Sequence, residues 1–236
     1  MRPEPAIPNA DPGTDKLARA LIAPIESGMI VGLGTGKAST RAMRALATRL
    51  RDEKLDIDCV CTSVATQQEA VALGLPVIPF EDVEDVDYLF DGASEVDRRL
   101  RMLKGSMGAI TRQRLVAAVA ARAVYCVGEE HFVEHLGSSA MLSVVVMPFG
   151  LASIRNALRD MGLVGVLRRN INGEAFFTDG GSVVFDMRLP ERDPVELAQE
   201  LDRVVGVVDH GIFLIECDEL LVECKGGEFK RVKREG

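Results

Sequence analysis

The first half of the chain alternates between short apolar runs and longer segments in which apolar residues recur every three to four positions. Runs of the first kind predict buried strands, and segments of the second kind predict amphipathic helices. The predicted strands span residues 29–31, 57–61, 77–80, 88–90 and 124–127, and the predicted helices span 17–25, the region around Met43 and Leu46, 65–73 and the region around Leu115 and Val119. Strands that alternate with helices predict a parallel sheet covered by helices on both faces.

The pattern changes after Gly128. Three strand-like runs and two helical segments follow, and Asp193 stands where it could cap the second helix. The strands are predicted at 143–147, 164–167 and 183–187, and the helices at 151–161 and 194–204. Two β-α-β pieces of this kind predict a small α+β domain of ferredoxin-like build.

Candidate chemistry is concentrated in residues 87–114, DYLFDGASEVDRRLRMLKGSMGAITRQR. In open α/β sheets, ligands bind beyond the carboxyl ends of the strands, so Asp91, Ser94 and Glu95 are predicted at the mouth of a crevice. Residues 104–108 form a glycine-rich turn that opens a helix, and such a turn points backbone N–H groups at an anion.

A second glycine-rich turn, GLGTG at residues 32–36, follows the first predicted strand and suits phosphate or sugar hydroxyls. Dinucleotide binding is not predicted, because Lys37 and Ser39 break the G-x-G-x-x-G pattern. A phosphate loop is also excluded, because Val31 and Ala38 replace its required glycine and hydroxyl residue. The alternative is a tight strand-to-helix turn without a ligand.

Composition and charge narrow the class of protein. The chain has 236 residues, of which 47% are hydrophobic and 27% charged, as in globular proteins with one large or two smaller domains. The net charge of −8 disfavours a nucleic-acid partner. The basic run at residues 230–234 is predicted to be a solvated terminus. The proline-rich residues 1–15 resemble neither a secretory signal nor a membrane span, so no membrane partner is expected.

The five cysteines lack metal-type spacing, and no cluster of His, Cys and carboxylate residues has ligand spacing. We therefore predict no metal and no cofactor. Buried, reduced thiols and the odd cysteine count indicate a cytoplasmic location.

Several motifs, taken in order, resemble the ribose-5-phosphate isomerase A family, whose members carry D-G-A-D-E-V and K-G-x-G-G-A-L-x-R-E-K segments. The corresponding residues are DGASEVD at 91–97 and LKGSMGAITRQR at 103–114, together with GLGTG at 32–36, TS at 62–63, VGEEHFVEHLG at 127–137, TDGGS at 178–182 and GVVDHGIF at 206–213. The resemblance spans nearly the whole chain. It implies that strands at 212–215 and 220–224 return to the first sheet, and that the protein forms homo-oligomers.

The fold expected from pattern and resemblance together is α/β. A Rossmann-like, mostly parallel sheet domain would comprise residues 1–128 and 206–236, and a smaller ferredoxin-like α+β domain would comprise residues 129–205.

The resemblance also implies an activity, which is the interconversion of ribose 5-phosphate and ribulose 5-phosphate through an enediolate. Asp91 and Lys104 would open the sugar ring and stabilise charge, and the partner is a small sugar phosphate. The implied substrate-binding residues are Gly34, Thr35, Gly36, Lys37, Gly92, Gly105, Ser106, Met107, Gly108 and His131.

Three positions depart from the family pattern. Ser94 replaces the second aspartate, Gln113 replaces the glutamate base, and His131 replaces a substrate-contacting lysine. An amide accepts no proton at neutral pH, and loss of a positioned base costs a factor of about 10² to 10⁴ in rate. Glu95, the 129–130 pair of glutamates and His131 are candidate replacements, each with a structural alternative. Two hypotheses remain: an isomerase with an altered base, and a non-catalytic sugar-phosphate-binding or regulatory relative.

Overall fold

The computed structural model describes residues 15–234 and is built around a six-stranded sheet with the order β13-β12-β6-β3-β1-β2. Its strands are β1 (Ile30–Leu33), β2 (Asp58–Cys61), β3 (Tyr88–Gly92), β6 (Ala123–Gly128), β12 (Glu219–Glu223) and β13 (Phe229–Lys233). All neighbouring strands run parallel except β13, which pairs antiparallel with β12. The predicted mostly parallel sheet is therefore confirmed.

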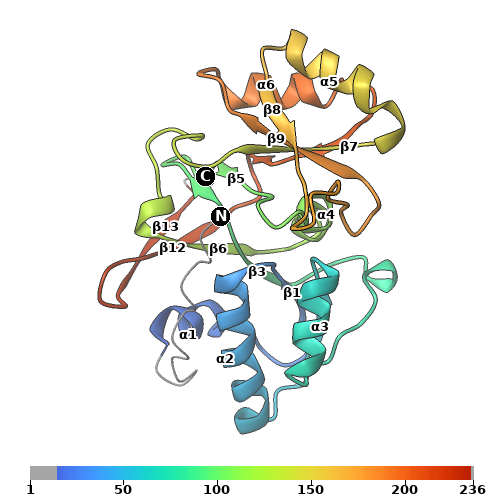
Figure 1. Cartoon of the computed structure of the whole chain (residues 1–236). Coiled ribbons are helices and arrows are strands. Elements are labelled where there is room, and N and C mark those ends of the chain that lie inside the picture. Colours follow the sequence, from blue (N-terminus) through green and yellow to red (C-terminus); the bar gives the residue numbers. More distant parts are fainter. Residues whose placement is uncertain (1–14, 235–236) are drawn as a thin grey trace.

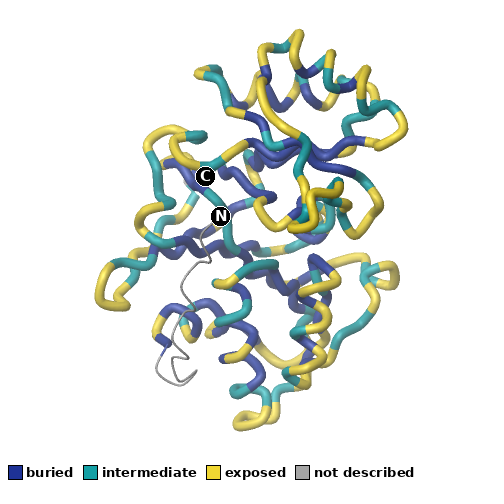
Figure 2. The backbone as a smooth tube through the Cα atoms, in the orientation of Figure 1, coloured by how far each residue is buried: buried dark blue, intermediate teal, exposed yellow. Residues whose placement is uncertain are grey.

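Helices α1 (Lys16–Ile22), α2 (Lys37–Glu53) and α3 (Val64–Ala72) lie on one face of this sheet, and α4 (Ile110–Ala118) lies on the other (Figure 1). The helices pack against the sheet through apolar stripes, which form a hydrophobic core on each face. Met43 of α2 and Phe90 of β3 belong to one core, and Val116 of α4 and Leu89 of β3 belong to the other. In Figure 2 the strands of the central sheet are largely buried, and buried and exposed positions are interspersed along the helices. Because successive residues of β3 point to opposite faces, Asp91 shares the face of Leu89, beneath α4.

A second sheet, with the order β10-β7-β9-β8, is antiparallel throughout. Its elements are β7 (Leu142–Val146), α5 (Leu151–Asp160), β8 (Val164–Leu167), β9 (Val183–Arg188), α6 (Pro194–Leu201) and β10 (Val207–His210). This β-α-β-β-α-β order confirms the ferredoxin-like prediction. Asp193 caps α6 by accepting a hydrogen bond from Val195 N at 2.7 Å. Val145 and Val184 belong to the core beneath α4, so this sheet packs over that side of the molecule.

A third sheet, which the sequence did not predict, consists of β11 (Ile212–Phe213), β5 (Met102–Leu103) and β4 (Glu95–Val96). The prediction that residues 212–215 join the central sheet is wrong, whereas the strand expected at 220–224 does return to it as β12. The reason is a contact between residues that are distant in sequence: Lys104 N donates to Gly211 O at 2.8 Å, which places the residues after Gly211 beside β5. A side chain at Gly211 would place its Cβ 2.3 Å from Lys104 O, so only glycine permits this approach.

One further prediction, the strand at residues 77–80, is corrected. Residues 77–80 form no strand: Val77 makes an isolated bridge to Cys59, and a short 3₁₀ turn, η1 (Phe80–Asp82), follows. Pro76 precedes this segment and Pro79 lies within it, and a proline carries no N–H for a sheet ladder. The basic run at residues 230–234 is exposed at Lys230, Arg231 and Lys233, which fits the predicted solvated terminus, and it also contributes edge strand β13, in which Arg231 forms an ion pair with buried Glu219 at 2.5 Å.

The five cysteines are free thiols, and three of them are buried. Within residues 15–234, no helix combines the length and apolar character needed to cross a membrane. The proline-rich segment at residues 1–15 lies outside the described residues except for Asp15, whose side chain accepts a hydrogen bond from Ala18 N at 3.0 Å at the start of α1.

Candidate active site

Asp91 is the centre of a buried polar cluster at the carboxyl end of β3. Its Oδ1 accepts hydrogen bonds from Thr35 N at 3.0 Å and Gly92 N at 2.7 Å. Its Oδ2 accepts from Lys104 Nζ at 2.9 Å and from Gln113 Nε2 at 2.8 Å. Because donors satisfy both oxygens, the carboxylate is held in one orientation.

Lys104 reaches this cluster from the end of β5, and its side chain is 1% exposed. Its ammonium also donates to Gly92 O. The same nitrogen lies 4.9 Å from the ring centre of Tyr125 and 5.7 Å from that of Phe213, which are distances typical of cation–π contacts. The aromatic rings exclude water from an ion pair that is already buried, so the pair interacts more strongly than one at the surface.

The GLGTG turn brings backbone close to Asp91 at Gly34. A Cβ built on Gly34 would lie 2.3 Å from Asp91 Oδ1, so a side chain cannot be accommodated without displacing the carboxylate. Gly36 follows with φ of 117°, and α2 begins at exposed Lys37. The turn therefore permits both the close approach to Asp91 and the start of the helix.

Thr35 joins this turn to the end of β2. Its hydroxyl lies 2.8 Å from that of Thr62, 2.9 Å from that of Ser63 and 3.0 Å from that of Thr66. The TS motif at residues 62–63 thus contributes to a hydroxyl cluster beside the carboxylate.

The second glycine-rich turn connects Lys104 to α4. Gly105 and Gly108 have φ of 106° and 81°, a region that favours glycine. A Cβ on Gly108 would lie 2.4 Å from the Phe176 ring of the second sheet's hairpin. Ser106 and Met107 between them are exposed. The turn is thus packed against the hairpin at its glycines and open at its tip.

The candidate replacements for the missing base are held elsewhere. Glu95 is buried, and its carboxylate accepts hydrogen bonds from Gly137 N at 2.6 Å and from Ala140 N at 2.8 Å. Burial alone would raise the pKa of Glu95, but these backbone bonds and the Ser139 side chain lower it. The residue clamps the 137–140 loop.

Ser94 and His131 are not drawn into the Asp91 cluster. Ser94 is half-buried and donates its backbone N–H to Leu103 O. His131 lies in the short turn η2 (Glu129–His131), and its Nε2 is 3.7 Å from Glu130. Within residues 15–234, no hydrogen bond or ion pair joins either side chain to Asp91 or Lys104.

Two residues near the cluster were not predicted from the sequence. Tyr125 pairs with Asp91 in register on β6, and its hydroxyl is buried without a hydrogen-bond partner. Burial first, and then the charge of Asp91, raise the pKa of Tyr125 well above its usual value. Arg168 reaches the second glycine-rich turn from the end of β8 and donates to Gly105 O at 2.8 Å. No local motif marks either residue, because each contact joins distant parts of the chain.

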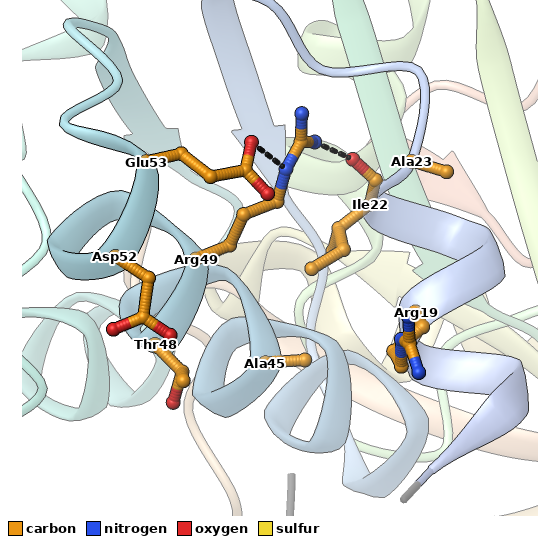
Figure 3. A pocket seen from close by; sticks show the side chains of 8 residues that line it. All are labelled: Arg19, Ile22, Ala23, Ala45, Thr48, Arg49, Asp52 and Glu53. Atoms are coloured by element: carbon orange, nitrogen blue, oxygen red, sulfur yellow. Dashed lines mark hydrogen bonds and ion pairs between the residues drawn. The ribbon is translucent and has the colours of Figure 1, made fainter. Parts of the chain in front are cut away.

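In the described part of the chain, no group of three or more His, Cys, Asp or Glu side chains is arranged to hold a metal ion. A groove of about 440 Å³ lies elsewhere, between α1 and α2 (Figure 3). Arg49 crosses it, donating to Ile22 O at 2.6 Å and pairing with Glu53 at 2.8 Å. None of the predicted site residues lines this groove, so the Asp91 cluster remains the candidate for chemistry.

The sequence profile of a known family, ribose 5-phosphate isomerase A (phosphoriboisomerase A), matches residues 58–227. A ribose-5-phosphate isomerase A from Chlamydia trachomatis serovar A is 36% identical over 225 residues, covering 94% of this chain and 92% of the relative. One from Bifidobacterium adolescentis is 37% identical over 199 residues, covering 84% and 85%.

Solved structures agree with these sequence matches. Ribose 5-phosphate isomerase A from Methanocaldococcus jannaschii superposes with a TM-score of 0.87 and 32% identity, over 92% of this chain and 96% of that one. A D-ribose-5-phosphate isomerase in complex with phospho-erythronic acid superposes with a TM-score of 0.88 and 28% identity over the same shares.

Proposed function

Because the chain belongs to the ribose 5-phosphate isomerase A family, we propose that it binds ribose 5-phosphate beside the Asp91 cluster and interconverts it with ribulose 5-phosphate. The observation that carries this proposal is the buried pair of Asp91 and Lys104, joined at 2.9 Å where β3 ends. A water-poor site with a fixed cation suits a reaction in which negative charge develops on a sugar oxygen.

The proposed reaction moves a proton between neighbouring carbons of the sugar and passes through an enediolate. Lys104 would stabilise the developing oxyanion, with Asp91 holding the ammonium in place. The backbone N–H groups of Ser106 and Met107 in the second glycine-rich turn would receive an anionic oxygen of the ligand. Gln113 would add a neutral hydrogen-bond donor but no proton acceptor. The rate is therefore expected to fall below that of an enzyme with a carboxylate there, by roughly 10² to 10⁴.

Gln113 also favours a second candidate, a non-catalytic relative that binds sugar phosphates. Its amide nitrogen lies 2.8 Å from Asp91 Oδ2, so the side chain at the family's base position is directed into the cluster and serves as a donor. A protein that binds the ligand without moving the proton would need this arrangement and no base.

A coupled assay of ribose 5-phosphate turnover, combined with calorimetry, separates the two candidates. Lys104→Ala purified in the same way is the control for contaminating host isomerase, and it should show no turnover. Wild-type turnover above this control supports the isomerase. Saturable binding of ribose 5-phosphate or phospho-erythronic acid without turnover supports the non-catalytic binder. Absence of both would overturn the proposal.

The double variant Ser94→Asp, Gln113→Glu tests whether the two carboxylate side chains are all that the site lacks for turnover. If the surrounding site is otherwise competent, restoring the two carboxylates should raise turnover by about 10² or more. The single variant Ser94→Asp is the matched control, because it adds charge without restoring the base.

A further inference from the structure

The glycine-rich turn at residues 105–108 is held from the second sheet by one arginine. Arg168 follows β8, and its Nη1 donates to Gly105 O at 2.8 Å and to Ser106 O at 3.2 Å. Figure 1 shows the segment between β8 and β9 beside α4, where this turn leads. Gly105 O also accepts from Gly108 N at 2.9 Å, so its carbonyl is fixed from two directions.

Arg168 is itself immobilised. Its Nε donates to Asp186 Oδ2 at 2.9 Å, and its Nη2 donates to Ser143 Oγ at 2.8 Å and to the other Asp186 oxygen. The guanidinium carbon lies 5.6 Å from the centre of the Phe176 ring, and the side chain is 13% exposed. A guanidinium has five N–H donors. All five are engaged within the protein, which leaves none for a ligand.

The contacts of Arg168 determine where the turn's N–H groups point. In a trans peptide the C=O and N–H groups face opposite ways. With the carbonyls of Gly105 and Ser106 directed at Arg168, the N–H groups of Ser106 and Met107 are directed away from it, on the exposed side of the turn. Neither N–H group has an acceptor within residues 15–234.

We propose that Arg168 is a positioning residue, which orients the peptide N–H groups of Ser106 and Met107 towards an anionic oxygen of the bound sugar phosphate. The inference rests on the proposed function, because that function supplies the ligand. Arg168 acts through the turn and not through its own charge, since its donors are already occupied.

The decisive variant is Arg168→Lys. Lysine keeps the charge and can pair with Asp186, but its compact ammonium cannot bridge both carbonyls and the second sheet at once. Arg155→Ala is the matched control: Arg155 packs over the Phe185 ring at 5.3 Å on α5 of the same unit, away from the turn.

Two measurements test the inference. Calorimetry with ribose 5-phosphate should give about tenfold weaker binding for Arg168→Lys, the loss of roughly one charge-assisted hydrogen bond, and unchanged binding for Arg155→Ala. Heteronuclear ¹⁵N NOEs without ligand should fall at residues 105–108 in Arg168→Lys only.

Wild-type affinity in Arg168→Lys would overturn the inference, because charge alone would then suffice. If the wild type does not bind ribose 5-phosphate, the proposed function fails, and the NOE measurement still decides whether Arg168 orders the turn. NOEs at residues 105–108 that are the same in Arg168→Lys and the wild type would also overturn the inference that Arg168 orders the turn.

Discussion

The charged residues of this protein differ widely in what they contribute, and burial accounts for the difference. Lys104 and Asp91 are almost completely buried, and each is the other's counter-ion. Lys16 and Glu228 also pair, but their side chains are 60% and 70% exposed. A buried charge that loses its partner keeps its desolvation penalty, whereas an exposed one is solvated by water.

Lys104→Ala should therefore destabilise the fold as well as abolish turnover. Removing the ammonium leaves the Asp91 carboxylate buried without its counter-ion, and we expect a loss of about 3–5 kcal/mol in the free energy of unfolding. Urea denaturation followed by circular dichroism measures it. Lys16→Ala is the control and should cost less than about 1 kcal/mol. Equal losses in the two variants would contradict this account of the buried pair.

His210 predicts a pH dependence of stability. Burial lowers its pKa and the Arg114 cation lowers it further, while Asp202 and Asp209 oppose the shift. The lowered pKa favours the neutral ring in the fold, and its Nδ1 accepts a hydrogen bond from Ile212 N at 3.2 Å. The unfolded chain, with a histidine pKa near about 6.5, takes up the proton first. Stability from this group is therefore present above that pH and lost as pH falls below it.

The free energy of unfolding should accordingly fall between about pH 7 and pH 5 in the wild type. In His210→Gln the contribution of His210 to this fall in the free energy of unfolding with pH should disappear. His135 is exposed, and His135→Gln should keep the wild-type slope. A slope unchanged by His210→Gln would show that other groups control acid stability.

At the scale of the elements, the sequence predicted those that carry their own periodicity. The parallel strands of the central sheet are mostly apolar because both faces of the sheet are covered, and Asp193 marks the start of α6. Strands β4, β5 and β11 have two residues each, which is too short to show a hydrophobic periodicity. Their pairing depends on the Lys104–Gly211 contact between distant residues, which no local pattern records.

The same limit applies to the site. Asp91, Lys104 and Gln113 lie in one stretch of the sequence, but Lys104 and Gln113 both reach Asp91 Oδ2 only because α4 packs against β3 and β5. Arg168 lies 63 residues beyond Gly105 along the chain, and no sequence motif identifies it.

Glycine substitutions test how tightly the β1–α2 turn approaches β3. In Gly34→Ala the new Cβ would lie 2.3 Å from Asp91 Oδ1 and 2.5 Å from Asp91 Cα, so backbone must move. We expect a loss of about 1–3 kcal/mol and weaker ribose 5-phosphate binding. In Gly92→Ala the nearest atom, Cys126 O, would be 3.6 Å away, an ordinary contact. Thermal unfolding of Gly34→Ala and Gly92→Ala measures the difference in stability. Equal stability of the two variants would contradict the close approach of Gly34 to Asp91.

At the scale of the whole molecule, the ferredoxin-like sheet is fixed to the central one at separate points. Val145 and Val184 enter the core beneath α4, and Arg168 holds the glycine-rich turn. Asp179, in the hairpin before β9, makes a further link: its Oδ2 accepts from Val64 N at 2.8 Å at the start of α3, and it lies 3.8 Å from Arg112. A carboxylate at a helix N-terminus is favoured by the helix dipole.

Asp179→Ala should therefore loosen the hairpin while leaving both sheets folded. The Val64 N–H loses its acceptor, and we expect faster amide exchange at Val64 with a loss of about 1 kcal/mol in the free energy of unfolding. Asp179→Asn keeps an acceptor oxygen and removes only the charge, so protection at Val64 should be largely retained. Equal exchange at Val64 in all three proteins would mean that the hairpin is held by its apolar contacts alone. Retention in Asp179→Asn but not in Asp179→Ala would identify the hydrogen bond, and not the dipole, as the link between the two sheets.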